Sequence, residues 1–408
     1  MNTDNLVQFL REKHQDHLLE YYDKLNEHDK STFVEQIENI DWNLLTALQQ
    51  KDRSQRRGNI RPLAACTIKE IRKNKEKFEE IGLNVIKDEK VAAVLLAGGQ
   101  GTRLGWDGPK GTVNIGKTKD LYIFEMLFRN TLTITKLAKT YIPFYIMTSD
   151  KNHEETVNFL TEKNFFGYPK EYVMFFQQEM APCVDFTGKI LMEEKDKIAL
   201  SPNGNGGWFY SMNKKGILAD LHKRGIEWLN VFSVDNVLQK ICDPVFLGAV
   251  IASNCVSGSK VVSKINPEEK VGVMCLEDGK PSIIEYYEMT EEMLYEKNSA
   301  GDYAYQYGVI LNYLFRVDCL EEILRANMPV HFAEKKIPYI TKNGEYISPE
   351  GPNGYKFELF ILDMIHLLDN CLPYEVERNR EFAPIKNATG VDSIESARAL
   401  LEENGIDL

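Results

Sequence analysis

The sequence has no long apolar run, no paired cysteine spacing and no excess of basic residues. Its longest apolar run, Val91–Ala97, has seven residues, far short of the roughly 20 that a membrane-spanning helix needs. Seven scattered cysteines without a CxxC pair argue against a disulfide framework and against a zinc site. The net charge of −12, without a basic stripe that contains aromatic residues, argues against a surface that binds nucleic acid or an anionic membrane.

The N-terminus also lacks the apolar core and the cleavage site of a signal peptide. We therefore expect a cytoplasmic protein. The chain has 408 residues, of which 43% are hydrophobic and 27% charged. This is enough for two or three domains with buried cores.

The first 88 residues predict a helical N-terminal region, because apolar residues recur there at spacings of three and four. Two capping boxes predict helix starts; they are Thr32 with Glu35 and Thr67 with Glu70. We expect the second of these helices to end at Gly82. The basic stretch between them, residues 51–61 (KDRSQRRGNIR), is either a solvated linker or a loop that attracts anions.

From Val91 onward, apolar strands alternate with amphipathic helical segments. The predicted strands are residues 91–97, 144–149, 173–177, 228–234 and 260–265, and helical patterns cover residues 121–128 and 154–160. Such alternation predicts an α/β fold of Rossmann-like type, with a mixed, mainly parallel sheet flanked by helices. Ligands of these sheets bind beyond the carboxyl ends of the strands.

A glycine-rich loop directly follows the first of these strands. Residues 95–110 read LLAGGQGTRLGWDGPK, and four glycines fall within residues 98–105, at positions 98, 99, 101 and 105. Glycines let the backbone turn sharply and bring its N–H groups against a nucleotide. Thr102, Arg103 and Lys110 add a hydroxyl and two cations, which suits a polyphosphate better than a neutral ligand.

A second motif competes with this loop. Residues 111–118 (GTVNIGKT) match the P-loop pattern GxxxxGK followed by Ser or Thr. A functional P-loop directly follows a buried strand, whereas this segment follows residues 105–110 (GWDGPK), which cannot form one. The glycine spacing also fails the dinucleotide fingerprint GxGxxG by one residue. A P-loop NTPase is therefore kept as a remote alternative.

The glycine-rich loop resembles the signature LxxGGxGTxxGxxxPK of the eukaryotic-type UDP-sugar pyrophosphorylases, and within that family the branch that makes UDP-N-acetylglucosamine. Further similar strings follow in order and extend the resemblance over about residues 90–390. They are residues 175–208 (FFQQEMAPCVDFTGKILMEEKDKIALSPNGNGGW), 231–236 (VFSVDN), 271–275 (VGVMC), 283–286 (IIEY), 335–340 (KKIPYI), 351–363 (GPNGYKFELFILD) and 382–388 (FAPIKNA).

The resemblance implies a Mg²⁺-dependent uridylyltransferase that forms UDP-N-acetylglucosamine and pyrophosphate from UTP and N-acetylglucosamine 1-phosphate. Uridylyl transfer to glucose 1-phosphate, or to a broad set of sugar 1-phosphates, is the nearest alternative. A nucleotide-sugar-binding protein without activity would be expected to lose its phosphate-facing charges, which are present here. We expect a monomer with a catalytic domain over residues 89–378 and a reduced C-terminal region over residues 379–408.

The resemblance also implies a role for each site residue. Arg103, Lys110 and Lys386 would neutralise charge on the phosphates, and Gly98, Gly99, Thr102, Gln178 and Gly204 would bind the nucleotide. The sugar-binding residues would be Asn205, Gly272, Glu285, Tyr286, Asn312, Lys356 and Phe360. Asp235, at the end of an apolar run, would hold Mg²⁺. Val309 replaces an asparagine of the family pattern that contacts the hexose, which leaves the sugar preference open.

Overall fold

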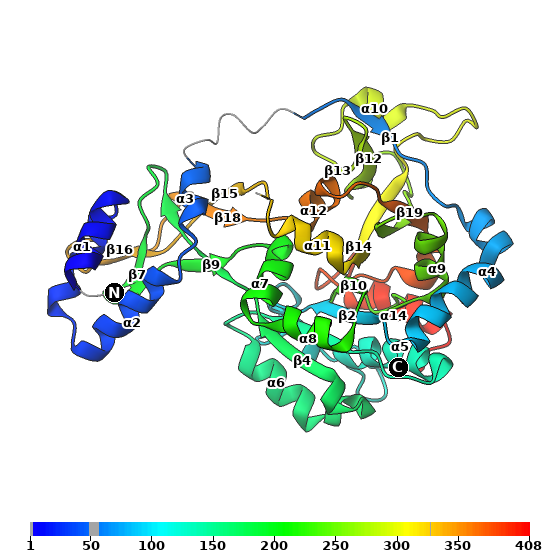
Figure 1. Ribbon diagram of the computed structural model, residues 1–408, viewed down its shortest axis with the longest axis horizontal. Coiled ribbons are helices and arrows are strands. Elements are labelled where there is room, and N and C mark those ends of the chain that lie inside the picture. Colours follow the sequence, from blue (N-terminus) through cyan, green and yellow to red (C-terminus); the bar gives the residue numbers. More distant parts are fainter. Residues whose placement is uncertain (1–2, 49–56, 327) are drawn as a thin grey trace. The chain divides into compact units, whose positions relative to one another are not determined.

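The computed structural model describes residues 3–48, 57–326 and 328–408 (Figure 1). The chain forms two compact units, each built from segments that are distant in sequence. The described parts of the small unit lie within residues 1–56, 179–207 and 328–361, and those of the large unit within residues 57–178, 208–327 and 362–408. The predicted domain boundaries, residues 88 and 378, divide the chain into consecutive segments. They stay a prediction.

The large unit is built on a mixed sheet, in which ten described strands take part. Its central part is parallel, in the order β10, β2, β3 and β4, and β14 continues it as an antiparallel neighbour of β10. The strands of this sheet are β1 Ile60–Pro62, β2 Val91–Leu96, β3 Phe144–Thr148, β4 Val173–Gln177, β10 Trp228–Ser233, β11 Ser257–Ser263, β12 Val273–Glu277, β13 Lys280–Ile284, β14 Tyr307–Arg316 and β19 Leu372–Glu375. The expected α/β fold with a mixed sheet is confirmed.

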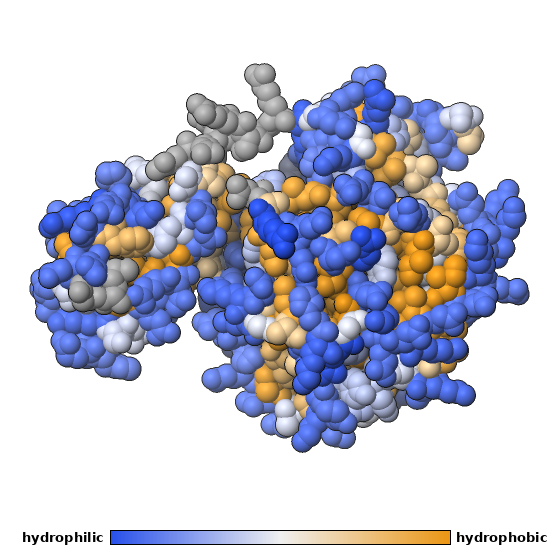
Figure 2. All heavy atoms as spheres, viewed as in Figure 1, coloured by the Kyte–Doolittle hydropathy of each residue, from blue (hydrophilic) through white to orange (hydrophobic). Residues whose placement is uncertain are grey.

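Helices flank this sheet (Figure 1). Every residue of β2 and β3 is buried, which explains why these strands read as continuous apolar runs. The α-helices of the described residues are α1 Thr3–Glu12, α2 Glu27–Glu38, α3 Trp42–Leu48, α4 Ile68–Lys87, α5 Ile123–Ala138, α6 His153–Glu162, α7 Trp208–Lys214, α8 Ile217–Arg224, α9 Pro244–Ala252, α10 Glu291–Tyr295, α11 Val317–Ile323, α12 Ile361–Leu367, α13 Arg378–Glu381 and α14 Ile394–Glu403. Figure 2 shows hydrophilic residues over most of the visible surface.

The small unit packs its helices against short strands. Leu6, Leu10 and Phe33 from α1 and α2 share one buried cluster with Ala181 and Phe357. Its strands are β5 Met180–Pro182, β6 Val184–Asp185, β7 Met192–Glu194, β8 Lys197–Ile198, β9 Leu200–Pro202, β15 His331–Lys335, β16 Tyr339–Ile340, β17 Tyr346–Ile347 and β18 Gly354–Glu358. None of the described helices is both long and apolar enough to cross a bilayer.

Of the two predicted capping boxes, one is present at a helix start and the other is not. The capping box of Thr67 and Glu70 is present at the start of α4. The box of Thr32 and Glu35 is wrong, because α2 begins after Asn26, whose side chain accepts from the backbone N–H of Asp29, and Thr32 lies within the helix. The N-terminal region also contains a strand, β1, where only helix was expected. Residues 51–56 of the basic stretch lie outside the described residues.

Gly82 does not end its helix, as the sequence suggested, because α4 continues to Lys87. It allows a close helix crossing instead. A Cβ on Gly82 would lie 1.9 Å from the carbonyl oxygen of Pro244 in α9, and a Cβ on Gly248 of α9 would lie 1.8 Å from the carbonyl oxygen of Phe78 in α4. The two glycines therefore let the backbones of α4 and α9 touch at two points.

We expect Gly82→Ala to lower the free energy of unfolding by about 2 kcal/mol, because the new methyl group forces the two helix backbones apart. The helix propensity of alanine alone would raise it by about 1 kcal/mol, so the two explanations of this glycine differ in sign. Urea unfolding followed by circular dichroism measures the change. Gly99→Ala is the matched control, since a Cβ there meets nothing within 4 Å. A Gly82→Ala protein as stable as the wild type would contradict the account.

Candidate active site

The glycine-rich loop leaves the carboxyl end of β2 and folds back on itself. The N–H of Gly101 donates to the carbonyl of Gly108 at 2.8 Å, and the N–H of Lys110 donates to the carbonyl of Gly99 at 3.1 Å. Gly105 has φ of +72°, in the left-handed region that glycine adopts readily. This internal hydrogen bonding leaves Gly99, Thr102 and Arg103 exposed, so the loop presents open backbone, a hydroxyl and a cation to a ligand.

Asn152, which no sequence motif marks, fixes the start of this loop. Its side chain is fully buried, and its amide donates to the carbonyls of Ala97 at 2.9 Å and of Gly99 at 3.3 Å. Its carbonyl oxygen accepts from the N–H of Ser149. Asn152 directly precedes α6, so the sequence pattern showed only a helix-start residue and gave no sign of a partner 53 positions away.

Gln178 and Gly98 are neighbours in space, as recognition of a nucleotide base by the Gln178 amide would require. Gln178 follows β4, only 8% of it is exposed, and its N–H donates to the carbonyl of Thr148 in the neighbouring strand. A Cβ on Gly98 would lie 2.9 Å from the amide nitrogen of Gln178. The absence of a side chain at position 98 therefore makes room for this amide, which can both donate to and accept from a ligand.

Lys110 and Asp235 form an ion pair that joins the loops after β2 and β10. The Nζ of Lys110 lies 2.5 Å from the Oδ1 of Asp235. Only 11% of the lysine side chain is exposed, against 30% of the aspartate side chain. Because β2 and β10 are parallel neighbours, both loops leave the same edge of the sheet. The two residues that the sequence analysis assigned to phosphate and to metal are thus in direct contact.

Asn236 ties the loop of Asp235 to the segment that carries Lys386. Its amide nitrogen donates to the carbonyl of Glu381 at 2.7 Å, and its amide oxygen accepts from the N–H of Ala383 at 2.9 Å. The N–H of Ile385 then donates to the carbonyl of Asp235 at 2.9 Å. Lys386, the next residue, is exposed and has the carboxylate of Asp392 3.6 Å away. These bonds hold the backbones of Asp235 and Lys386 side by side.

The residues around Asp235 fit a magnesium ion that draws most of its ligands from phosphates and water. Among the described residues, no group of three or more His, Cys, Asp or Glu side chains could hold a metal ion. Asp235 offers a carboxylate with its second oxygen unpaired by Lys110. Mg²⁺ is commonly bound through one or two carboxylates together with substrate phosphates, so a single aspartate at a phosphate-binding loop suits it.

Three of the predicted sugar-binding residues cluster at the ends of β12 and β13. A Cβ on Gly272 would lie 3.4 Å from the carboxylate of Glu285, and the carbonyl of Gly272 accepts from the N–H of Val309 at 2.9 Å. Burial first, and the charge of Glu288 second, raise the pKa of the Glu285 carboxyl. Tyr286 is 41% exposed. Val309, at which the chain departs from the family pattern, therefore lies next to this cluster.

Arg57, which belongs to the basic stretch of residues 51–61, holds the loop of Glu285 in place. Its guanidinium donates to both carboxylate oxygens of Glu288 at 2.9 and 2.8 Å and to Glu277 at 2.9 Å. Glu288 in turn accepts from the backbone N–H of Glu285 at 2.9 Å. Burial raises the pKa of Glu288, but the hydrogen bonds and the charge of Arg57 outweigh it and the pKa is lowered.

Asn312 does not belong to a sugar site, contrary to the sequence analysis. It is fully buried in β14, and its amide oxygen accepts from Asn230 of β10 at 2.8 Å. Its amide nitrogen donates to the side chain of Gln239 at 3.1 Å and to the carbonyl of Lys240. Both ends of the amide are therefore used inside the protein, where they brace the loop that carries Asp235.

Four predicted site residues lie in the small unit. Gly204 has φ of +86°, and a Cβ on it would lie 2.4 Å from the carbonyl of Leu359. The side-chain oxygen of Asn205 accepts from the N–H of Ile361 at 3.1 Å, which leaves its amide nitrogen for a ligand. Lys356 lies in β18, half-buried, and the ring of Phe360 stacks at 4.5 Å on His331.

The P-loop match fails on geometry. The N–H groups of Val113, Ile115, Gly116 and Thr118 all donate to acceptors within the protein, whereas a P-loop turns such groups toward phosphate. Lys117 pairs with Glu402 at 2.6 Å. The next helix, α5, begins only at residue 123, so no helix N-terminus follows the motif.

These features define a nucleotide-binding α/β protein whose site gathers cations and one carboxylate at the carboxyl ends of parallel strands. The chain belongs to the UTP–glucose-1-phosphate uridylyltransferase family, which it matches over residues 15–407.

Three relatives show how close the match is. A Dictyostelium discoideum protein named probable UDP-N-acetylglucosamine pyrophosphorylase is 35% identical over 415 aligned positions, which cover 96% of this chain and 85% of that protein. The Homo sapiens UDP-N-acetylhexosamine pyrophosphorylase-like protein 1 is 38% identical over 327 positions, or 78% of this chain, but these span only 64% of the human protein. The crystal structure of the Trypanosoma brucei uridine diphosphate N-acetylglucosamine pyrophosphorylase, solved with an inhibitor, superposes with a TM-score of 0.83 at 28% identity, covering 98% of this chain and 84% of that one.

We expect Arg57→Met to destabilise the protein in a pH-dependent way. The carboxyls of Glu277 and Glu288 have a lowered pKa in the folded protein, so their pairing stabilises it above the ordinary pKa of 4.5 and is lost as the pH falls through the lowered values. At pH 7 the variant should lose about 1 kcal/mol of unfolding free energy, a modest value because Arg57 is partly exposed. Below pH 4 the difference from the wild type should shrink.

Urea unfolding at several pH values measures this difference. Arg61→Met is the control, because Arg61 is exposed on β1 and has no ion pair among the described residues. A loss of stability that stays constant or grows at low pH would show that Arg57 acts by packing and not through its carboxylate partners.

Proposed function

We propose that this protein transfers the uridylyl group of UTP to N-acetylglucosamine 1-phosphate and so forms UDP-N-acetylglucosamine and pyrophosphate. The observation that carries the proposal is the contact of Lys110 with Asp235 beside the glycine-rich loop. It puts a cation and a potential metal ligand at the place where a triphosphate would lie on such a sheet. The names of the Dictyostelium and Trypanosoma relatives support the same activity.

In the proposed reaction, an oxygen of the sugar phosphate attacks the α-phosphorus of UTP. The bond from that phosphorus to the bridging oxygen breaks, and pyrophosphate leaves with the electron pair. Such a transfer needs in-line positioning and neutralisation of charge rather than a nucleophilic side chain. Arg103, Lys110 and Lys386 supply the positive charge in this proposal, and Mg²⁺ bound by Asp235 would supply further charge on the phosphates when present.

The remaining residues bind the two substrates. Gln178 would contact the edge of the uracil, while Gly98, Gly99 and Thr102 would approach the ribose and phosphates through backbone and hydroxyl groups. The other nucleotide-binding residue in the proposal is Gly204. The sugar-binding set, reduced by Asn312, is Asn205, Gly272, Glu285, Tyr286, Lys356 and Phe360. The monomeric state and the cytoplasmic location stay predictions from the sequence.

Glucose 1-phosphate is a second candidate acceptor. Val309 adjoins Gly272 and Glu285, and its side chain offers no hydrogen bond to an N-acetyl group or to a hydroxyl. A pocket without that hydrogen bond discriminates less between sugars that differ in one polar group.

Release of pyrophosphate from UTP, measured with Mg²⁺ and a set of sugar 1-phosphates, tests the proposal. We expect N-acetylglucosamine 1-phosphate to give the highest kcat/KM, with glucose 1-phosphate and N-acetylgalactosamine 1-phosphate below it. Release that needs no sugar phosphate at all would favour a nucleotide hydrolase instead. Equal or better turnover of glucose 1-phosphate would overturn the sugar assignment and leave the uridylyl transfer standing.

A further inference from the structure

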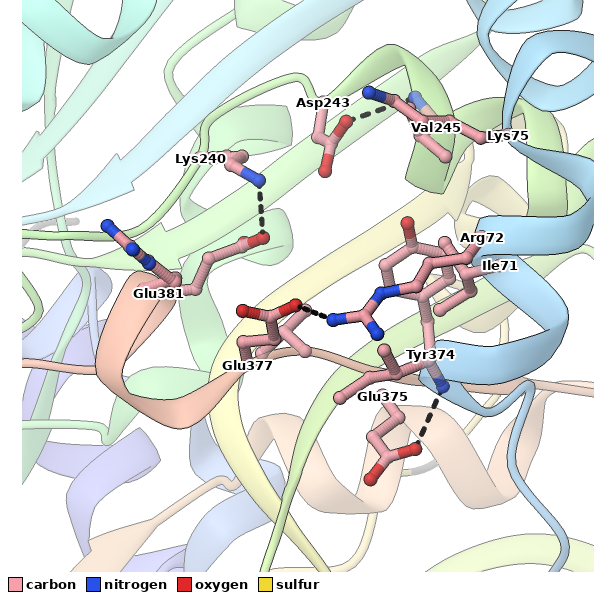
Figure 3. Close-up of a pocket in the computed structure, with 13 residues that line it drawn as sticks. Ile71, Arg72, Lys75, Lys240, Asp243, Val245, Tyr374, Glu375, Glu377 and Glu381 are labelled. Carbon is pink, nitrogen blue, oxygen red and sulfur yellow. Dashed lines mark hydrogen bonds and ion pairs between the residues drawn. The ribbon is translucent and has the colours of Figure 1, made fainter.

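A second pocket lies in the large unit, and none of the proposed substrate-binding residues lines it (Figure 3). It has a volume of about 260 Å³ and is formed by α4, β19, α13 and the segment before α9. Four cations and four carboxylates line it. The cations are Arg72, Lys75, Lys240 and Arg380, and the carboxylates are those of Asp243, Glu375, Glu377 and Glu381.

The carboxylates of this pocket are already engaged by the protein. Glu375 accepts from the N–H of Ile68 at 2.9 Å and from the hydroxyl of Ser263 at 2.7 Å, and Glu377 pairs with Arg72 at 2.6 Å. Asp243 and Glu381 both bind the ammonium of Lys260, a fully buried residue, at 3.2 and 2.5 Å.

Three donors of the pocket have no charged partner among the described residues. Among the described residues, Lys75 forms no ion pair or hydrogen bond, and the guanidinium of Arg380 reaches only the neutral side chain of Asn404 at 3.0 Å. The hydroxyl of Tyr374 likewise has no hydrogen-bond partner in the described part of the chain, although only 4% of this residue is exposed. Figure 3 shows this hydroxyl directed toward the side of the pocket that carries Asp243 and Lys75.

The pocket therefore contains positive charge, on Lys75 and Arg380, that no carboxylate of the described residues pairs with. The four carboxylates already accept hydrogen bonds or ion pairs from the protein, and Lys260 adds a fifth cation next to Asp243 and Glu381. A ligand that matches this arrangement has to supply acceptors and negative charge. The open donors come from three separate elements, α4, β19 and α13, and several separate donors suit the several oxygens of a phosphate better than a planar carboxylate.

We propose that this pocket binds a phosphate group, either as inorganic phosphate or as the phosphate ester of a small metabolite. Lys75 and Arg380 provide the charge, and the Tyr374 hydroxyl donates a hydrogen bond at the base. The volume of 260 Å³ lies just below the range of drug-sized ligand sites, which begins at about 300 Å³, so the ligand is small.

Isothermal titration calorimetry of the full chain with inorganic phosphate and with glucose 6-phosphate, in the absence of Mg²⁺ and UTP, tests the proposal. We expect one site that the double variant Lys75→Met, Arg380→Met weakens by at least about tenfold, as expected for the loss of two charged donors. Tyr374→Phe, which removes only the hydroxyl, should weaken it by about fivefold. Tighter binding of glucose 6-phosphate assigns the site to an ester, and equal binding assigns it to phosphate itself.

Arg103→Ala distinguishes this pocket from the proposed substrate site, which also binds phosphates. Binding that survives Arg103→Ala but falls in the double variant supports the proposal, whatever the protein catalyses. Binding that is lost in Arg103→Ala and unchanged in the double variant would overturn it, as would the absence of binding at millimolar phosphate. Circular dichroism of each variant checks that the fold is intact.

Discussion

The ion pair of Lys110 and Asp235 is the contact on which the candidate site depends. It joins the loops that follow two neighbouring parallel strands, β2 and β10, which pair over their whole length. A nearly buried ammonium needs a compensating charge, and Asp235 provides it without blocking its own second oxygen. The pair therefore holds the two loops at one edge of the sheet and keeps a cation and a carboxylate where triphosphate and metal ion would meet.

The surrounding residues act on this pair through the backbone. Asn152 holds the start of the loop that leads to Lys110. Asn236 and the buried amides of Asn230 and Asn312 brace the loop that carries Asp235. Glu381 extends this support, because its carbonyl accepts from Asn236 and its carboxylate binds the buried Lys260. The same glutamate lines the proposed phosphate pocket, so the two sites share one structural element.

The sequence patterns predicted those features that depend only on residues close together in the chain. The parallel strands were found because most of their positions are apolar. The glycine-rich loop was found because its glycines act through the backbone itself. The start of β11 at Ser257 was missed, since its first three residues, Ser-Gly-Ser, look like a turn although they are buried. Gly82 and Asn312 were misjudged, Asn152 was not found, and the carboxylate partners of Arg57 in the basic stretch were not foreseen, because each acts on a partner far away in sequence. Only the packed chain shows that Gly82 faces Pro244.

The most direct test of the account compares the kcat of Lys110→Ala and Lys117→Ala for pyrophosphate release from UTP and N-acetylglucosamine 1-phosphate. Both changes remove a lysine ammonium from neighbouring loops, but only Lys110 faces Asp235, whereas Lys117 pairs with Glu402. We expect a fall of at least about 100-fold for Lys110→Ala, the scale set by one lost transition-state donor, and a kcat near that of the wild type for Lys117→Ala. A Lys110→Ala protein with unimpaired kcat, or a collapse in Lys117→Ala alone, would contradict the account.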